Sequence, residues 1–326
     1  MLRSPTDWIW DFWLADDGSD FHMFYLHAPR SLGDPDLRHW SVSIGHAVSP
    51  DLQDWVDVGD ALAPGSPGGI DDRATWTGSV VRRPDGTWVM FYTAASSAEN
   101  GLVQRVGVAR SPDLYTWSKQ VSAVLEAEPQ WYEKLDAGQW FDEAWRDPWV
   151  FPDPSGVGWH MLITARAAAG APDQRGVIAH ATSPDLAAWT VGPPLSTPGS
   201  GFGHLEVPQV ATVEGRTFLV FSCLGEQLSD ARRAAGQRGG IWAAPSPGLL
   251  GPYDTGRAEA LTDESLYSGR LIQDRTGQWV LLAFRNTEDG RFVGEITDPL
   301  PVTWSNTDPA RLTVVARELV SPDTGE

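Results

Sequence analysis

Residues 44–55 read Ile44-Gly-His-Ala-Val-Ser-Pro-Asp-Leu-Gln-Asp-Trp55. This pattern is an apolar strand, a Ser-Pro-Asp-Leu turn and a tryptophan. It recurs at residues 106–117 and 178–189, with weaker copies at 241–253 and 294–304. Short apolar strands separated by Gly, Pro, Asp and Ser turns are typical of antiparallel sheets. A unit that recurs five times along a chain predicts an array of similar sheets.

A second pattern, a glycine-containing turn followed by an apolar strand, alternates with the first. Its five copies lie at residues 18–28, 86–94, 156–165, 215–223 and 277–285. One such unit cannot bury both of its faces, but a radial arrangement packs each unit on its neighbours and protects the strand edges. The sequence therefore predicts an all-β fold, a five-bladed β-propeller with four-stranded antiparallel blades. We expect residues 1–326 to form this single domain, with a loop or short helix at 227–237.

Composition narrows the possible partners and locations. The net charge of −19 argues against nucleic acid or an anionic membrane surface as a partner. No apolar run has the length of a signal peptide core or a membrane span, so we expect a cytoplasmic protein. The single cysteine, Cys223, excludes a disulfide framework within the chain. The sequence does not indicate an oligomeric state.

The first strand of each propeller blade lines the central channel, and these strands carry unusual residues. We counted twelve residues back from the start of each second strand, and ten in the tighter first blade. The positions reached in the five blades are Asp11, Trp76, Asp147, Glu206 and Tyr267. Three carboxylates on one axis repel one another and cost stability. Such an arrangement is usually retained only where it serves a function. Taken singly, Asp11 could cap a turn and Arg146-Asp147 could be a structural ion pair.

The motifs around these positions resemble the glycoside hydrolase clan of families 32 and 68, which contains invertases, inulinases, levanases and levansucrases. Trp10-Asp11-Phe12-Trp13 is similar to the levansucrase Trp-Asp-x-Trp motif, and Arg146-Asp147-Pro148 matches the Arg-Asp-Pro motif. Trp76-Thr77-Gly78-Ser79 is similar to the blade-two motif, with Thr in place of Ser. Glu206-Val207-Pro208 falls where the families have their acid/base glutamate. The resemblance covers roughly residues 5 to 290.

The resemblance implies a retaining hydrolase that releases a terminal β-D-fructofuranosyl unit from sucrose or fructo-oligosaccharides. Asp11 would be the nucleophile, Glu206 the acid/base and Asp147 the transition-state stabiliser, and a retaining pair lies about 5 to 5.5 Å apart. Arg146 would help to keep Asp147 ionised. The residues expected to contact substrate are Trp10, Trp76, Thr77, Arg146, His204 and Tyr267. We expect no metal and no organic cofactor, although Asp71-Asp72 leaves a structural calcium open.

Some features depart from the families, and three alternatives stay open. The Asn-Asp-Pro-Asn-Gly run of family 32 is missing, and Val207 replaces the usual Cys or Arg. We also expect no C-terminal β-sandwich of the kind that many family 32 enzymes have. The alternatives are a fructosyltransferase with the same active residues, an inverting arabinofuranosidase-type enzyme, and a sugar-binding propeller without activity. The inverting enzyme would separate its carboxylates by about 6.5 to 9.5 Å.

Overall fold

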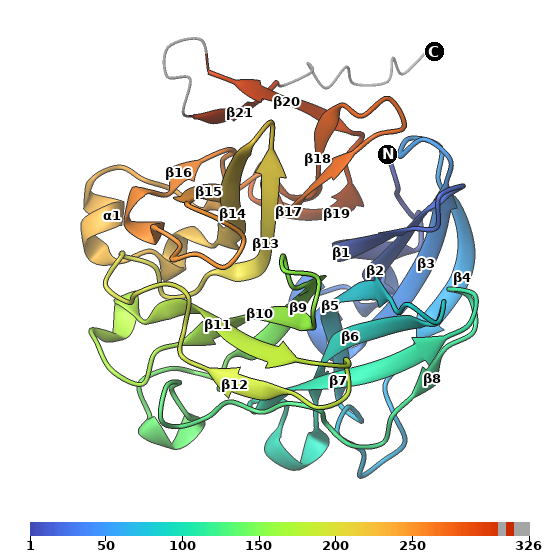
Figure 1. Cartoon of the computed structure of the whole chain (residues 1–326), viewed down its shortest axis with the longest axis horizontal. Helices are drawn as coiled ribbons and strands as arrows, with labels where there is room; N and C mark the ends of the chain where they lie inside the picture. Colours follow the sequence, from blue (N-terminus) through green and yellow to red (C-terminus); the bar gives the residue numbers. More distant parts are fainter. Residues whose placement is uncertain (306–310, 316–326) are drawn as a thin grey trace.

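The structure is a computed structural model that describes residues 1–305 and 311–315. Five antiparallel sheets surround a common axis, which confirms the predicted five-bladed propeller (Figure 1). The first strands of neighbouring sheets pack on one another and line the axis. Of the expected domain range 1–326, residues 306–310 and 316–326 lie outside the described part.

The strands of each sheet follow one another along the chain. The first sheet contains β1 (Asp7–Asp16), β2 (Phe21–Pro29), β3 (Ser43–Ser49) and β4 (Val56–Leu62). The second contains β5 (Ala74–Arg82), β6 (Trp88–Ala95), β7 (Gln104–Ser111) and β8 (Ser118–Lys119). The third contains β9 (Trp145–Pro152), β10 (Trp159–Arg166), β11 (Gly176–Ser183) and β12 (Thr190–Gly192). The fourth contains β13 (Glu206–Val213), β14 (Arg216–Cys223), β15 (Gly240–Ser246) and β16 (Glu259–Ala260).

The fifth sheet has one strand more than the four that we predicted. It contains β17 (Leu266–Gln273), β18 (Trp279–Glu288), β19 (Arg291–Ile296), β20 (Leu300–Trp304) and β21 (Leu312–Val314). The strand β18 is 10 residues long, and different parts of it pair with β19 and with β20. The ring closes where β1 packs against β19 and β18.

Helical segments are short and lie between the strands. The one α-helix of the described residues, α1 (Asp230–Ala234), falls in the segment expected to be a loop or short helix. The 3-10 turns are η1 (Arg30–Leu32), η2 (Pro35–Trp40), η3 (Ser97–Glu99), η4 (Leu135–Ala137), η5 (Pro172–Gln174), η6 (Gly225–Gln227) and η7 (Thr255–Arg257). Within the described part, no helix combines the length and the apolar character needed to cross a membrane.

The repeated Ser-Pro-Asp-Leu-x-x-Trp segment is a turn that hydrogen bonds fix. In the second blade, the carboxylate of Asp113 accepts hydrogen bonds from the backbone N–H groups of Tyr115 and Thr116. Leu114 adopts a φ of 70°, and its carbonyl accepts a hydrogen bond of 2.8 Å from the Trp117 indole. The turn therefore directs the tryptophan back onto the sheet, where it packs against buried apolar side chains.

A β-bulge interrupts the first strand of every blade near one end of the axis. The pairing with the second strand shifts by one residue, for example between Trp10 and Phe12 in β1. The residues at the bulge positions are Asp11, Thr77, Asp147, Val207 and Ser268. The residues immediately before them are Trp10, Trp76, Arg146, Glu206 and Tyr267. Bulges re-aim side chains and are common next to active sites.

This register corrects the equivalence that we derived by counting. Asp11 and Asp147 occupy the bulge itself, whereas Trp76, Glu206 and Tyr267 lie one position earlier in their blades. The count failed in the third blade because its hairpin is longer. Pro152 pairs with Trp159 around residues 153–158, while Arg82 pairs with Trp88 around residues 83–87.

Candidate active site

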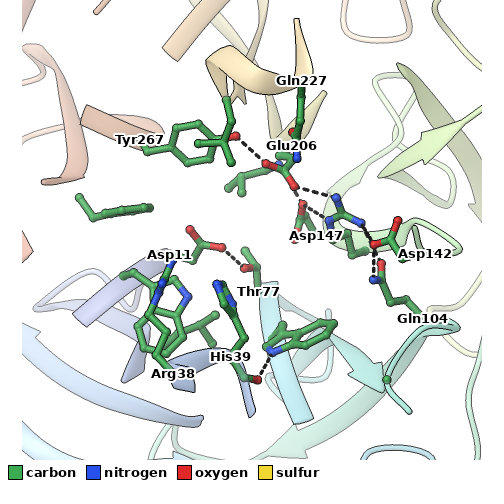
Figure 2. A pocket seen from close by; sticks show the side chains of 18 of the residues that line it. Asp11, Arg38, His39, Thr77, Gln104, Asp142, Asp147, Glu206, Gln227 and Tyr267 are labelled. Carbon is green, nitrogen blue, oxygen red and sulfur yellow. Dashed lines mark hydrogen bonds and ion pairs between the residues drawn. The ribbon is translucent and has the colours of Figure 1, made fainter. Parts of the chain in front are cut away.

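A cavity of about 330 Å³ lies over the bulges. The expected site residues that line it are Trp10, Asp11, Trp76, Thr77, Arg146, Asp147, Glu206 and Tyr267. Figure 2 shows that the carboxylates come from separate blades and point into a common space. The first strands thus bring together the three acids that the sequence singled out.

Asp11 is held at the bulge of β1 with a φ of 29°. One of its carboxylate oxygens accepts a hydrogen bond of 2.6 Å from the Thr77 hydroxyl, and the other accepts one from the Ser268 hydroxyl. Burial raises the pKa of Asp11, and the two hydroxyl donors act in the opposite direction. The carboxylate is therefore fixed in orientation by neighbours on both sides of its blade.

Asp147 is the corresponding residue of β9, with a φ of 58°. Its carboxylate accepts hydrogen bonds from the Thr164 hydroxyl at 2.8 Å and from the Val207 backbone N–H at 3.0 Å. Burial raises the pKa of Asp147 to about 7, although the neighbouring Arg146 opposes the shift. We expected Arg146 to favour the ionised form, and it does so, but the effect of burial is larger.

Glu206 lies at the first residue of β13 and has two strong donors. The Arg146 guanidinium donates to one carboxylate oxygen at 2.7 Å, and the Tyr267 hydroxyl donates to the other at 2.5 Å. Its side chain is 16% exposed, against 4% for Asp147, so Glu206 is the more accessible of the two. The same interactions orient Glu206 toward the cavity.

Arg146 connects the acids of the site. Besides Glu206, it donates to Asp142 and to the side-chain carbonyl of Gln104, each at 3.0 Å. Burial disfavours its charged form, but the carboxylates of Asp142, Glu206 and Asp147 outweigh this and hold the pKa of Arg146 above its usual value. The guanidinium thus remains a fixed positive charge beneath the cavity.

His204 does not occupy the expected place. It is fully buried, does not line the cavity, and its Nδ1 lies 3.0 Å from the Arg146 guanidinium. Because a guanidinium only donates, Nδ1 is the acceptor in this pair. The expected contact of His204 with substrate is therefore corrected: His204 accepts a hydrogen bond from Arg146 and lies outside the cavity.

Aromatic rings form part of the cavity wall. The Trp76 indole donates a hydrogen bond of 2.9 Å to the His39 carbonyl, and its ring lies 5.4 Å from that of Trp40. Trp10 and Tyr267 also line the cavity. Ring faces of this kind pack against the apolar faces of sugars.

Several lining residues escaped the sequence analysis. They are Leu26, Arg38, His39, Trp40, Gly101, Leu102, Gln104, Phe141, Asp142, Val207, Leu224, Gln227, Phe284 and Asn286. Most of them lie in connections between strands or near strand ends, where the repeat gives no fixed spacing. Asp142 forms an ion pair with Arg146, but the segment between them is not helical, so their spacing of four residues carried no signal in the sequence.

The described residues contain no group of three or more His, Cys, Asp or Glu side chains that could hold a metal ion. Asp71, which we considered for calcium, accepts a hydrogen bond of 2.9 Å from the Tyr92 hydroxyl and one from Lys119.

A five-bladed propeller with buried carboxylates on its axis, a guanidinium between them and aromatic walls is the architecture of a class of glycoside hydrolases. Residues 12–288 match the model of the glycosyl hydrolases family 32 N-terminal domain, and the chain belongs to this family.

Curated relatives support this assignment over different lengths. The extracellular sucrase of Zymomonas mobilis is 24% identical over 335 residues, covering 90% of this chain and 78% of that protein. Beta-fructofuranosidase 1 of Zea mays is 32% identical over 122 residues, covering 36% of this chain but only 17% of the maize protein.

Solved structures share the fold. An inulosucrase from Halalkalicoccus jeotgali bound to kestose superposes with a TM-score of 0.78 at 22% identity, covering 96% of this chain and 90% of that one. A levansucrase from Gluconacetobacter diazotrophicus gives a TM-score of 0.74 at 17% identity, covering 97% and 82%. A family 32 beta-fructofuranosidase from Bombyx mori gives 0.73 at 20% identity, covering 97% and 64%.

The expected cytoplasmic location is wrong in the light of these relatives. The sucrase that matches 90% of this chain is an extracellular enzyme. Our expectation rested on the lack of an apolar run at the start of the sequence, and that feature does not determine where a protein functions.

Proposed function

We propose that this protein is a retaining β-fructofuranosidase that releases a terminal β-D-fructofuranosyl unit from sucrose or fructo-oligosaccharides. The observation that carries the proposal is the unequal setting of two carboxylates on one cavity. Asp11 is buried and receives only neutral hydroxyl donors, whereas Glu206 is more accessible and lies against Arg146 and Tyr267. Pairs of acids in different environments serve different roles in glycoside cleavage.

In the first step, the carboxylate of Asp11 attacks the anomeric carbon. The bond between this carbon and the leaving oxygen breaks, and Glu206 delivers its proton to that oxygen. The donors Arg146 and Tyr267 then stabilise the ionised Glu206 that remains. Asp147, fixed by Thr164 and the Val207 N–H, binds ring hydroxyls and strengthens its contact as the oxocarbenium-like charge develops.

In the second step, ionised Glu206 takes a proton from water, and the resulting oxygen nucleophile displaces Asp11 from the anomeric carbon. Fructose leaves with its original configuration, because two displacements restore it. An acceptor sugar in place of water would give transfer by the same residues. The Asparagus officinalis relative named 6(G)-fructosyltransferase, 34% identical over 116 residues, makes transfer the second candidate.

Release of glucose and fructose from sucrose, inulin and levan tests the proposal. We expect Asp11→Ala to abolish both products. Glu206→Gln should reduce turnover of sucrose by about 10²- to 10⁴-fold, the usual contribution of a positioned acid. The same variant should lose less on an aryl fructoside whose leaving group needs no proton, and Asp16→Ala, on the exposed end of β1, should behave as wild type.

The outcomes separate the candidates. From sucrose, equal amounts of glucose and fructose support hydrolysis, and an excess of glucose supports transfer. Inversion of configuration in the first-formed fructose would contradict the roles of Asp11 and Glu206. Cleavage of an aryl arabinofuranoside without any action on fructosides would contradict the fructose assignment, and inactivity on every furanoside would favour a binding propeller.

A further inference from the structure

Arg38 is a buried cation on the cavity wall that the mechanism above does not use. It lies in η2, between the second and third strands of the first blade, and its side chain is only 12% exposed. Burial lowers the pKa of Arg38 to about 10, so the guanidinium is still charged at neutral pH. A charge held at this depth needs partners.

The partners that the protein supplies are few. A guanidinium has five N–H donors. One hydrogen bond of 2.8 Å runs from Nη1 to the Pro35 carbonyl, and the buried Nε has no hydrogen-bond partner among the described residues. The ion pair with Asp36 is 3.7 Å long, and the Asp36 side chain is 92% exposed. Most of the donors of Arg38 are therefore free.

Aromatic rings fix the orientation of the group. The guanidinium carbon lies 4.0 Å from the centre of the Phe292 ring and 5.4 Å from that of Trp10. A guanidinium that lies over a ring face keeps its N–H bonds in its own plane, so the contact with the ring does not occupy them. The free N–H groups of Arg38 are thus held in fixed directions and stay available for hydrogen bonds.

The position of Arg38 identifies the part of the substrate that it meets. The positive charge of Arg38 acts on Asp11, yet no ion pair within 4.0 Å joins these two residues in the described structure. Figure 2 shows Arg38 beside Asp11 and on the side of the cavity away from Asp142 and Gln104. In the proposed reaction, Asp11 carries the fructosyl unit, and the leaving group is on the side of Glu206.

We propose that Arg38 is a specificity-determining residue whose free N–H groups bind hydroxyl oxygens of the fructosyl unit carried by Asp11. This inference rests on the proposed function and adds a residue to it. Neutral sugar hydroxyls accept such hydrogen bonds, and the neighbouring Asp11 charge disfavours an anionic sugar at the same place.

The test compares Arg38→Gln and Arg38→Lys with wild type on sucrose, kestose and an aryl fructoside. These substrates share the fructosyl unit and differ in the leaving group. We expect Arg38→Gln to lower kcat/KM by roughly 10- to 100-fold, as for the loss of a hydrogen bond to a charged group, and by the same factor on all three. Arg38→Lys should restore part of the loss. Arg275→Gln is the matched control, because Arg275 also lies over a ring, that of Phe21 at 3.6 Å, but does not line the cavity.

A direct binding measurement separates this role from a structural one. We expect Arg38→Gln to weaken calorimetric binding of free fructose by a similar factor. A loss that varies with the leaving group, or a lower melting temperature with unchanged fructose binding and kcat/KM, overturns the inference and leaves the proposed function intact. Wild-type protein that neither binds fructose nor cleaves any fructoside overturns both.

Discussion

The carboxylate of Asp147 lies at the candidate active site, and its burial lowers the stability of the folded protein. Its backbone lies in the left-handed region, and its side chain is almost completely buried. Burial raises its pKa to about 7, and like charges on Asp11 and Glu206 act in the same direction. Such a residue destabilises the folded protein whenever it is ionised.

This leads to a prediction for Asp147→Asn. Because the folded pKa lies above the unfolded value, the folded state binds more protons between about pH 4 and pH 7, and stability falls as pH rises through this window. The amide carries no charge, so the variant should be more thermostable than wild type at pH 8 and inactive. Thermal melts from pH 5 to pH 8 measure this. An advantage that does not grow with pH would contradict it, and Asp16→Asn, an exposed carboxylate, is the control.

At the scale of elements, two hairpins share the same feature, a pair of hydrogen-bonded histidines on adjacent strands. In the first blade, His22 of β2 pairs with His46 of β3 at 2.9 Å. In the third blade, His160 of β10 pairs with His180 of β11 at 2.8 Å, and Asp153 supports His160 at 2.7 Å. Burial lowers the pKa of both His46 and His180 to about 4.

His46 and His180 predict a loss of stability in acid. Because the pKa of both is lowered to about 4 in the folded protein and is near 6.5 when it unfolds, the folded state becomes less stable as pH falls from about 6.5 to 4. We expect His46→Gln together with His180→Gln to flatten the denaturant-unfolding free energy over this range. The control is His27→Gln, on the partly exposed end of β2. An unchanged pH slope in the double variant would refute the assignment.

At the scale of the whole molecule, the ring must close between its first and last sheets. Arg30 donates hydrogen bonds to the Asp7 carbonyl of β1 at 2.9 Å and to the Val293 carbonyl of β19 at 3.1 Å. Leu2 and Ile296 form a backbone bridge at the same junction. Residues from the two ends of the chain thus hold one seam.

We therefore expect Arg30→Gln to destabilise the fold by about 2 kcal/mol, the usual contribution of a hydrogen bond to a charged group. Urea unfolding measures the change. Arg110→Gln, at an exposed position of β7, should change stability by less than about 0.5 kcal/mol. Equal stability of the two variants would show that the seam does not depend on Arg30.

The sequence by itself determined the number of blades and the three acids. The repeats made this possible, because each blade reuses the same turn and strand patterns, and Asp11, Asp147 and Glu206 lie on strands that the repeat locates. Counting could not assign their exact level along the axis, since one hairpin is a residue longer and every first strand is bulged.

Only the tertiary structure decided the remainder of the site. Arg38 and Asp142 come from connections that have no spacing rule, and they reach the cavity because the closed ring brings these connections together. His204 precedes Glu206 by only two residues, but its buried side chain contacts Arg146 and does not line the cavity. A repeat encodes the positions that recur in every blade, whereas contacts between side chains from different blades exist only once the ring has closed.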